Sequence, residues 1–228
     1  MTPEQFVPAV QAAFAPLADA TRAQAMKAYL LNQFEFVGLP APVRRQAVRA
    51  LGKVVWTREG LLQVAQQLWC LPEREYRYTA VDALRQHSRL LQPTDVLRLR
   101  ELLQRDAWWE TVDGLSAVIS EVLHRAYQAD AHATAFMDEW VGHADFWVRR
   151  SAMLHQLGWR LDTNESRLFG YALQLAPEKE FFIRKAIGWA LRDYARWNPQ
   201  AVTDFVVQHR DRLSPLTVRE AAKHLELP

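Results

Sequence analysis

The chain has 228 residues, carries a formal net charge of +2 and is 50% apolar. This length and apolar content suffice for one large folded domain or two small ones, and they exclude an intrinsically disordered chain. No apolar run approaches the roughly 20 residues that cross a bilayer, so we expect no membrane-spanning helix. The N-terminal residues lack the basic segment of an export signal, and we therefore expect a cytoplasmic protein.

The apolar residues follow the spacing of amphipathic helices from Phe6 to Leu225, and the alternation typical of β-strands is absent. Turn signals divide the chain at Gly38-Leu39-Pro40, Leu71-Pro72, Gln92-Pro93, Ala176-Pro177, Asn198-Pro199 and Ser214-Pro215. Helices are expected to begin close to Pro93 and Pro215, because proline is favoured in the first helical turn. The sequence therefore predicts an all-α protein.

A repeated pattern indicates that the helices are stacked in pairs. An acid or proline is followed three and four positions later by an apolar residue and an arginine, and this pattern begins at Pro40, Asp145, Glu180 and Pro215. With weaker landmarks at Glu75 and Asp106, the repeat starts lie 35, 31, 39, 35 and 35 residues apart. The stretch from Asp145 to Ala152 is similar to the HEAT-repeat signature. We therefore expect a right-handed α-solenoid with a concave face, formed by residues 1–228 as one domain.

The arginines of this pattern have two interpretations. They recur at one repeat position, as Arg44, Arg149, Arg184 and Arg219. They form either a structural ladder, in which each pairs with an acid of a neighbouring repeat, or a basic track for a phosphate backbone. Better candidates for contact with a polyanion are the additional bases Arg45, Arg150, Lys185, Lys27 and Arg160.

An aromatic and acidic motif lies between Asp106 and Asp113. Trp109 and Asp113 are four residues apart, so they share one face of a helix. An aromatic plane beside an unpaired, exposed carboxylate suits a site that handles a cation. The alternative is that the tryptophan belongs to the core and that the acid is merely solvated. Asp82 holds the same repeat position as Asp113 but has no tryptophan four residues before it, so the motif is not a general repeat feature.

Other known chemistry motifs are absent from the sequence. We find no phosphate-binding glycine loop, no His-x-x-x-His pair and no nucleophile elbow, so we expect no metal site and no cofactor. The lone Cys70 cannot form an internal disulfide or a Cys-based zinc site, and we expect it to be a small buried apolar residue. Glu73, Glu75 and Glu101 are expected to be solvated or to pair with nearby arginines.

Several blocks, in order along nearly the whole chain, resemble a known family. They are Met26-Lys27-Ala28-Tyr29-Leu30 with Phe34-x-Phe36-x-Gly38, Leu68-Trp69-x-Leu71-Pro72-Glu73-Arg74-Glu75, Trp108-Trp109-x-x-Val112-Asp113, Trp147-x-x-Arg150-x-Ala152, and the long block from Lys179 to Tyr194. These blocks resemble the AlkD family of bacterial alkylpurine DNA glycosylases, whose fold is a HEAT-like solenoid.

Residue by residue, the resemblance implies functional roles. The family's catalytic acid falls on Asp113, and its two site tryptophans fall on Trp109 and Trp189. Its site arginine falls on Arg150, which would hold a phosphate, and Tyr29 matches a tyrosine near the lesion. Further DNA contacts are expected at Lys27, Arg45 and Lys185. Pro40 and Ala41 depart from the polar turn of many relatives, which puts the DNA contacts of that turn in question.

The implied activity is hydrolysis of the N-glycosidic bond of purines alkylated at N3 or N7, such as 3-methyladenine and 7-methylguanine. The substrate would be double-stranded DNA, and the reaction would belong to base excision repair. The resemblance also implies that the enzyme leaves the base inside the duplex. We further expect a monomer that needs no cofactor. No lysine is placed by a motif as a Schiff-base nucleophile, so we expect no strand cleavage. Two other functions stay open, a DNA-structure-binding solenoid without catalysis and a protein-interaction scaffold.

The repeat numbering does not by itself bring the implied site residues together. Trp109 and Asp113 take the third and seventh positions of their repeat. Arg150 and Trp189 take the fifth and ninth positions of theirs, about 200° further round an ideal helix. Convergence of these four residues therefore rests on the resemblance.

Overall fold

The protein is described by a computed structural model that covers residues 1–225. Within these residues the chain forms 13 α-helices and short 3-10 turns without a β-strand, which confirms the predicted all-α class. The helices fall into two compact units, Met1–Gln92 and the residues from Pro93 onward. A single domain of residues 1–228 stays a prediction, as do the right-handed twist and the concave face.

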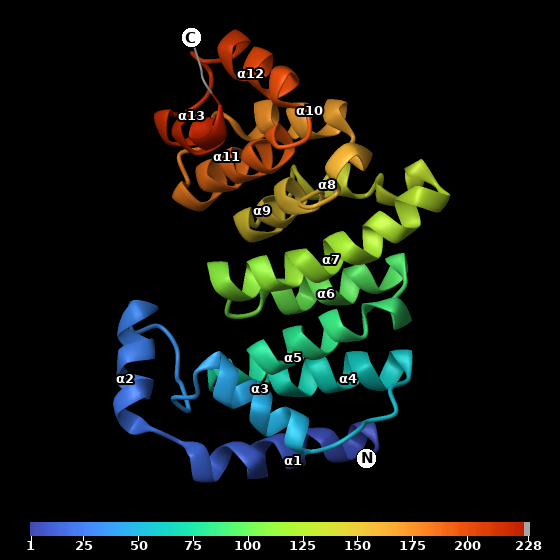
Figure 1. The fold of residues 1–228 in the computed structure, drawn as a ribbon, viewed down its shortest axis with the longest axis vertical. Coiled ribbons are helices and arrows are strands. Elements are labelled where there is room, and N and C mark those ends of the chain that lie inside the picture. The colour runs from blue at the N-terminus through green and yellow to red at the C-terminus, as the bar shows by residue number, and fades with distance from the viewer. Residues whose placement is uncertain (226–228) are drawn as a thin grey trace. The chain divides into compact units, whose positions relative to one another are not determined.

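The first unit contains α1 (Pro3–Phe14), α2 (Ala20–Tyr29), α3 (Ala41–Ala50), α4 (Arg58–Trp69) and α5 (Arg74–Gln86). Helix α4 packs along α5, and α1 packs against both α3 and α4 (Figure 1). Phe14 stacks on Tyr76 in the core of this unit, with ring centroids 5.5 Å apart. Cys70 is exposed, so the prediction of a buried cysteine is wrong. The reason is that Cys70 is the C-cap of α4, where the chain leaves the buried face of the helix.

Glu75 has a structural role in the first unit that differs from the prediction. Its fully buried carboxylate accepts hydrogen bonds from the backbone N–H groups of Val37, Gly38 and Leu39, at 3.0, 2.9 and 3.0 Å. The expectation of a solvated or arginine-paired acid is therefore wrong, because three backbone donors satisfy the buried charge. Gly38 has a φ of 94°, and a β-carbon there would lie 2.1 Å from the Asp19 carbonyl oxygen. Glu75 thus fixes a glycine turn that leads into α3.

The second unit contains α6 (Val96–Gln104), α7 (Trp109–Ala129), α8 (Met137–Trp140), α9 (Phe146–Leu154), α10 (Glu165–Leu175), α11 (Phe181–Ala195), α12 (Pro199–Gln208) and α13 (Pro215–Ala221). Helix α6 packs on α7, α8 on α9 and α10 on α11. Helices α7, α9, α11 and α13 pack on one another in that order, as Figure 1 shows. These contacts confirm the stacked helix pairs of an α-solenoid.

Polar residues cap three helices of this row. Asp145, Glu180 and Ser214 each accept a hydrogen bond from a backbone N–H group in the first turn of α9, α11 and α13, respectively. A 3-10 turn at Pro93–Asp95 leads into α6, and α13 begins at Pro215. Both expected helix starts are therefore confirmed.

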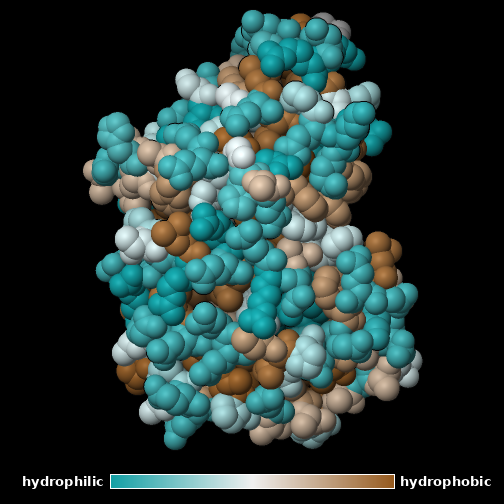
Figure 2. Space-filling view, turned by 180° about the vertical axis from the view of Figure 1, so that it is seen from behind, coloured by the Kyte–Doolittle hydropathy of each residue, from teal (hydrophilic) through white to brown (hydrophobic). Residues whose placement is uncertain are grey.

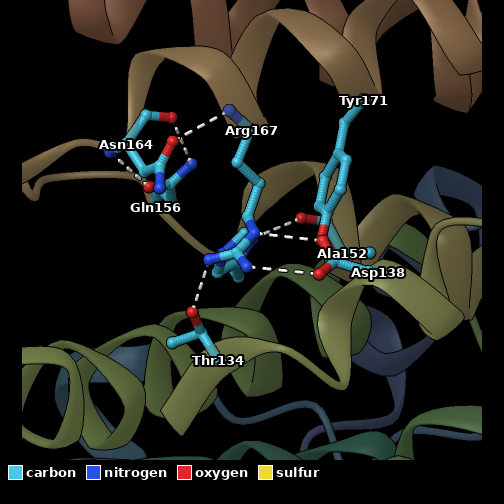
Figure 3. A network of polar contacts seen from close by, with 8 residues as sticks. Thr134, Asp138, Ala152, Gln156, Asn164, Arg167 and Tyr171 are labelled. Atoms are coloured by element: carbon cyan, nitrogen blue, oxygen red, sulfur yellow. Dashed lines mark hydrogen bonds and ion pairs between the residues drawn. The ribbon is translucent and has the colours of Figure 1, made fainter. Parts of the chain in front are cut away.

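A polar network ties α8 to α10 (Figure 3). Arg167 donates to both carboxylate oxygens of Asp138, at 3.1 and 3.2 Å, and to the Thr134 hydroxyl at 2.6 Å. The Tyr171 hydroxyl also donates to Asp138, at 2.6 Å. His155 lies beside this network, and burial lowers its pKa to about 4. The imidazole is therefore neutral at pH 7, and its Nδ1 lies 2.6 Å from a backbone carbonyl oxygen of α9.

Gly188 allows α11 and α13 to approach closely. A β-carbon at this position would lie 2.5 Å from Glu220 Cβ and 2.9 Å from the Thr217 carbonyl oxygen. We expect Gly188→Ala to lower the free energy of unfolding by about 1–3 kcal/mol in urea denaturation, because α13 must shift. Gly170→Ala in α10 is the matched control, since a β-carbon there meets nothing within 4 Å. An unchanged free energy of unfolding for Gly188→Ala would show that α11 and α13 can move apart without loss of stability.

The surface is mainly hydrophilic on the face that Figure 2 shows, where polar residues separate the apolar ones into small patches. Within residues 1–225, no helix combines the length and the apolar character needed to cross a membrane.

Candidate functional site

A pocket of about 400 Å³ lies along the row formed by α7, α9, α11 and α13. It is lined by Trp109, Asp113, Arg150, Phe181, Phe182, Lys185, Trp189, Arg192 and Glu220. The pocket therefore brings together five predicted site residues, which are Asp113, Trp109, Trp189, Arg150 and Lys185.

The observed helix starts differ from the two weaker repeat landmarks. Helix α7 follows the N-cap Trp108 and α5 follows the N-cap Glu73, so the starts at Asp106 and Glu75 are each wrong by two residues. Asp106 has a φ of 47°, in the left-handed region that interrupts a helix, and it belongs to the turn before α7. Trp108 is hard to recognise as a cap because its side chain has no oxygen to accept a backbone hydrogen bond.

Counting from the observed N-caps explains why the site residues converge. Asp113, Arg150 and Lys185 each stand five residues after the cap of their helix. Trp109 stands one residue after its cap, and Trp189 stands nine after its cap. Steps of four residues keep to one helix face, so all five positions share the face that lines the pocket. The apparent rotation of about 200° came from the misplaced start of α7.

Asp113 is held by a bidentate ion pair. Arg150 donates from Nε to Asp113 Oδ1 and from Nη2 to Asp113 Oδ2, both at 2.8 Å. Its Nη1 donates to the Phe182 carbonyl oxygen. The side chains of Arg150 and Asp113 are 5% and 19% exposed. The prediction of an exposed, unpaired acid is therefore wrong, because the equivalent residue of the next repeat lies directly opposite.

Aromatic side chains pack around this ion pair. The Arg150 guanidinium lies 5.9 Å from the centroid of the Phe182 ring. Trp108 and Trp147 contact the same ring, with centroid separations of 5.3 and 4.9 Å. The Phe182 ring shields one side of the arginine from water, which strengthens its attraction to Asp113. Trp108 and Trp147 pack against this ring and support its position.

A second ionic cluster lines the same pocket. The Glu220 side chain is 8% exposed and lies 3.0, 3.0 and 2.9 Å from Lys185, Arg192 and Lys223. One carboxylate thus holds three cations, and the cluster keeps a net charge of +2. The side chains of Lys185 and Arg192 are 37% and 20% exposed, so an anion can reach them. Fixed cations of this kind suit a phosphate group.

The ionisation of Glu220 makes folding sensitive to acid. Hydrogen bonds from Lys223 and Lys185 lower the pKa of Glu220 from 4.5 to about 2. Because the folded-state pKa is depressed, this stabilisation is complete above about pH 4.5 and is lost as the pH falls towards 2. Glu220→Gln should lower the melting temperature at pH 7 and have little effect near pH 2. Glu101→Gln, at an exposed position, is the control for thermal unfolding across this range. A Glu220→Gln deficit that persists unchanged at pH 2 would contradict this assignment.

The other three predicted DNA contacts belong to the first unit. Tyr29 ends α2 and is 73% exposed. Lys27 Nζ lies 2.6 Å from the Glu35 carboxylate. Arg45 donates to both carboxylate oxygens of Asp82, at 2.9 and 3.1 Å. Their contacts with DNA stay predictions. To bind a DNA phosphate, Lys27 and Arg45 would have to release the carboxylates with which they now pair.

The structural ladder is confirmed for two of the landmark arginines. Arg44 lies 2.8 Å from Asp82, and its side chain is 4% exposed. Arg149 donates to both carboxylate oxygens of Glu178, at 2.7 and 2.8 Å. Asp82 stands nine residues after the N-cap of α5, so it is not the counterpart of Asp113 and the earlier equivalence is wrong.

Four lining residues were not among the predicted site residues, namely Phe181, Phe182, Arg192 and Glu220. The first three lie in the block from Lys179 to Tyr194 that carries the family resemblance, so that block contained a signal for them. Glu220 lies outside every such block, and the packing of α13 on α11 decides its place. In the part of the chain that the structure describes, no cluster of three histidine, cysteine or acidic residues could hold a metal ion.

Similarity to known proteins agrees with the fold. Residues 10–225 match a family described as DNA alkylation repair enzyme. Among solved structures, a predicted DNA alkylation repair enzyme from Enterococcus faecalis is 31% identical, with a TM-score of 0.83, and the match covers 91% of this chain and 96% of that chain. No match is found among curated proteins. The resemblance seen in the sequence is thereby confirmed, and the chain belongs to the DNA alkylation repair enzyme family.

Proposed function

We propose that the protein is a monofunctional DNA glycosylase that releases N3- and N7-alkylated purines from double-stranded DNA in base excision repair. The observation that carries this proposal is the Asp113 carboxylate, which two hydrogen bonds from Arg150 fix in a pocket also lined by Trp109 and Trp189. Family membership supports a role in DNA repair. Action as a monomer in the bacterial cytoplasm belongs to the same proposal.

The chemistry of the substrate determines what the pocket must supply. A purine alkylated at N3 or N7 is cationic, so it is already a good leaving group and needs no proton. As the N-glycosidic bond breaks, positive charge concentrates on the deoxyribose. A fixed carboxylate and electron-rich ring faces stabilise such a charge in a site that is partly shielded from water.

Asp113 is the group that meets this requirement. Its carboxylate stabilises the cationic sugar and accepts a hydrogen bond from the water that attacks the anomeric carbon. A carboxylate accepts about four hydrogen bonds, and Arg150 occupies two of them, so capacity for the water is retained. Trp109 and Trp189 flank the sugar, which excludes other water and adds attraction to the cation.

The geometry favours a positioning role for Arg150. Its guanidinium donates to Asp113 and Phe182, and the side chain is almost completely buried. Lys185 and Arg192 are more exposed and are therefore better suited to bind a phosphate of the damaged strand. The phosphate contact of Arg150 that the resemblance implies stays a prediction.

Charge also supports recognition without base flipping. Lys185 and Arg192 line the pocket and would repel a cationic purine that entered it, whereas they attract a phosphate. We propose that the base stays in the duplex and that the enzyme recognises the lesion nucleotide through its sugar and phosphates. Tolerance of bulky cationic adducts follows from this mode of recognition.

Incubation with methylated duplex DNA tests the proposal. Chromatography should detect free 3-methyladenine and 7-methylguanine, while the strand stays unbroken until it is treated with alkali. A duplex with an uncharged purine lesion should release its base much more slowly. Base release no higher than that of a protein-free blank would overturn the proposal.

The bidentate ion pair between Asp113 and Arg150 is also compatible with a second function, a DNA-structure-binding protein without catalysis. Such a protein would show DNA affinity that weakens steeply with salt but would release no base. A protein-interaction scaffold would show neither salt-dependent DNA affinity nor base release. The same assay, combined with a salt series of DNA binding, separates the three functions.

A further inference from the structure

A cavity of about 730 Å³ lies within the first unit, apart from the residues of the proposed glycosylase pocket. Its lining comes from α1, α3, α5 and the segment between α3 and α4. Its volume falls in the range of about 300–1,000 Å³ that is typical of small-molecule sites.

The cavity is strongly basic. Its charged lining consists of one acidic residue, Asp82, and five basic residues, Arg44, Arg45, Arg49, Lys53 and Arg85. This lining carries a net charge of +4, although the whole chain carries only +2. The pocket in the second unit is less basic, because three basic and two acidic residues line it. The excess positive charge of the cavity is a specific attraction for an anion.

The basic side chains of the cavity are only partly neutralised by acidic residues of the protein. Arg44 and Arg45 lie 2.8 and 2.9 Å from the same Asp82 oxygen. Arg49, Lys53 and Arg85 are exposed and form no ion pair within residues 1–225. Three cations are therefore available to an anionic ligand.

Apart from Thr79 and Gln86, the rest of the lining is apolar or aromatic. The Trp56 ring contacts Phe6 edge to face, with centroids 5.1 Å apart, and lies 5.6 Å from the His87 ring. Burial lowers the pKa of His87, which favours the neutral imidazole and a ring face without a charge. Val48 and Val54 also line the cavity. The ligand thus needs a flat, weakly polar part as well as an anionic part.

We propose that this cavity binds a nucleoside phosphate whose base is unpaired. The cations bind the phosphate, and the partly exposed rings of Trp56 and His87 accept the base. Two sources have this chemistry, a free mononucleotide and a nucleotide of single-stranded DNA. A base inside an intact duplex has both faces covered by its neighbours, so an undamaged duplex does not fit this lining. This inference goes beyond the proposed glycosylase activity and does not depend on it.

Isothermal titration calorimetry of the whole chain tests the proposal. The probes are deoxyadenosine monophosphate, deoxyadenosine, inorganic phosphate, a short single-stranded oligonucleotide and the matching duplex. The monophosphate or the single strand should bind more tightly than deoxyadenosine or inorganic phosphate. Binding of the monophosphate indicates a free nucleotide as the ligand, and binding of the strand alone indicates single-stranded DNA. The proposal is overturned if neither binds, or if inorganic phosphate or the duplex binds as tightly as the tighter of these two probes.

Substitutions locate the binding in the cavity. The double variant Arg49→Gln, Arg85→Gln should weaken binding of the tighter probe by roughly tenfold or more, because charge-assisted hydrogen bonds are lost. Both side chains are exposed, so the fold should persist. Arg89→Gln, at an exposed position outside the lining, is the matched control and should leave binding unchanged. Equal affinities of the double variant and the control would place the ligand elsewhere and contradict the proposal.

Discussion

Replacing Asp113 by asparagine is expected to slow the release of 3-methyladenine by roughly 100- to 1,000-fold, because a fixed charge aimed at a developing opposite charge contributes about this factor. Asparagine keeps the size of the side chain and removes its negative charge. Single-turnover base release with the protein in excess over methylated duplex measures the chemical step directly.

The same substitution should also reduce stability. Asp113 pairs with Arg150, which is almost completely buried, so the amide leaves a buried guanidinium with a weaker partner. We expect a loss of about 1–3 kcal/mol in the free energy of unfolding, which urea denaturation would detect. Asp211→Asn at an exposed position is the control for both measurements. If Asp113→Asn releases 3-methyladenine as fast as the unsubstituted protein at temperatures well below the melting temperature of the variant, the acid is structural rather than catalytic.

Replacing Arg150 by alanine is expected to lower the free energy of unfolding by about 3–5 kcal/mol and to slow base release strongly. The substitution removes both hydrogen bonds that orient Asp113 and the one to the Phe182 carbonyl. Arg150→Lys restores the charge but not the planar fork, so it should recover part of the stability and only part of the rate. Stability, single-turnover rate and duplex affinity should be measured for both variants.

The separation of rate from affinity distinguishes two roles for Arg150. A positioning residue lowers the rate and leaves the duplex affinity largely intact, whereas a phosphate contact lowers the affinity first. Arg149→Ala is the matched control, because it removes a neighbouring bidentate ion pair with Glu178. This variant should be less stable but should release bases at an unchanged rate while folded. Equal slowing by Arg149→Ala and Arg150→Lys would contradict the positioning role.

The positions of some helices were predictable because their first turns carry recognisable chemistry. Asp145 and Glu180 are acids that cap α9 and α11, and Pro215 begins α13. The start of α7 was not predictable in this way, since its cap is Trp108 and the nearby acid Asp106 belongs to the preceding turn. Local chemistry therefore located the repeat starts at Asp145 and Glu180, whose side chains cap their helices. It misplaced the starts of α5 and α7, whose N-caps Glu73 and Trp108 accept no capping hydrogen bond with their side chains.

The sequence by itself determined the helical class and the paired repeats. The family resemblance pointed to Asp113, Trp109, Trp189 and Arg150, and the additional basic residues of the repeats pointed to Lys185, so that five of the nine residues that line the pocket were predicted. These follow from periodicity, turn residues and motifs, which act over short distances along the chain. Only the tertiary structure decided that Arg150 binds Asp113 and that Glu220 binds Lys185, because each pair joins residues 37 or 35 positions apart. Such contacts depend on how the helices stack. The stacking turned an acid that looked exposed into an oriented, partly buried carboxylate.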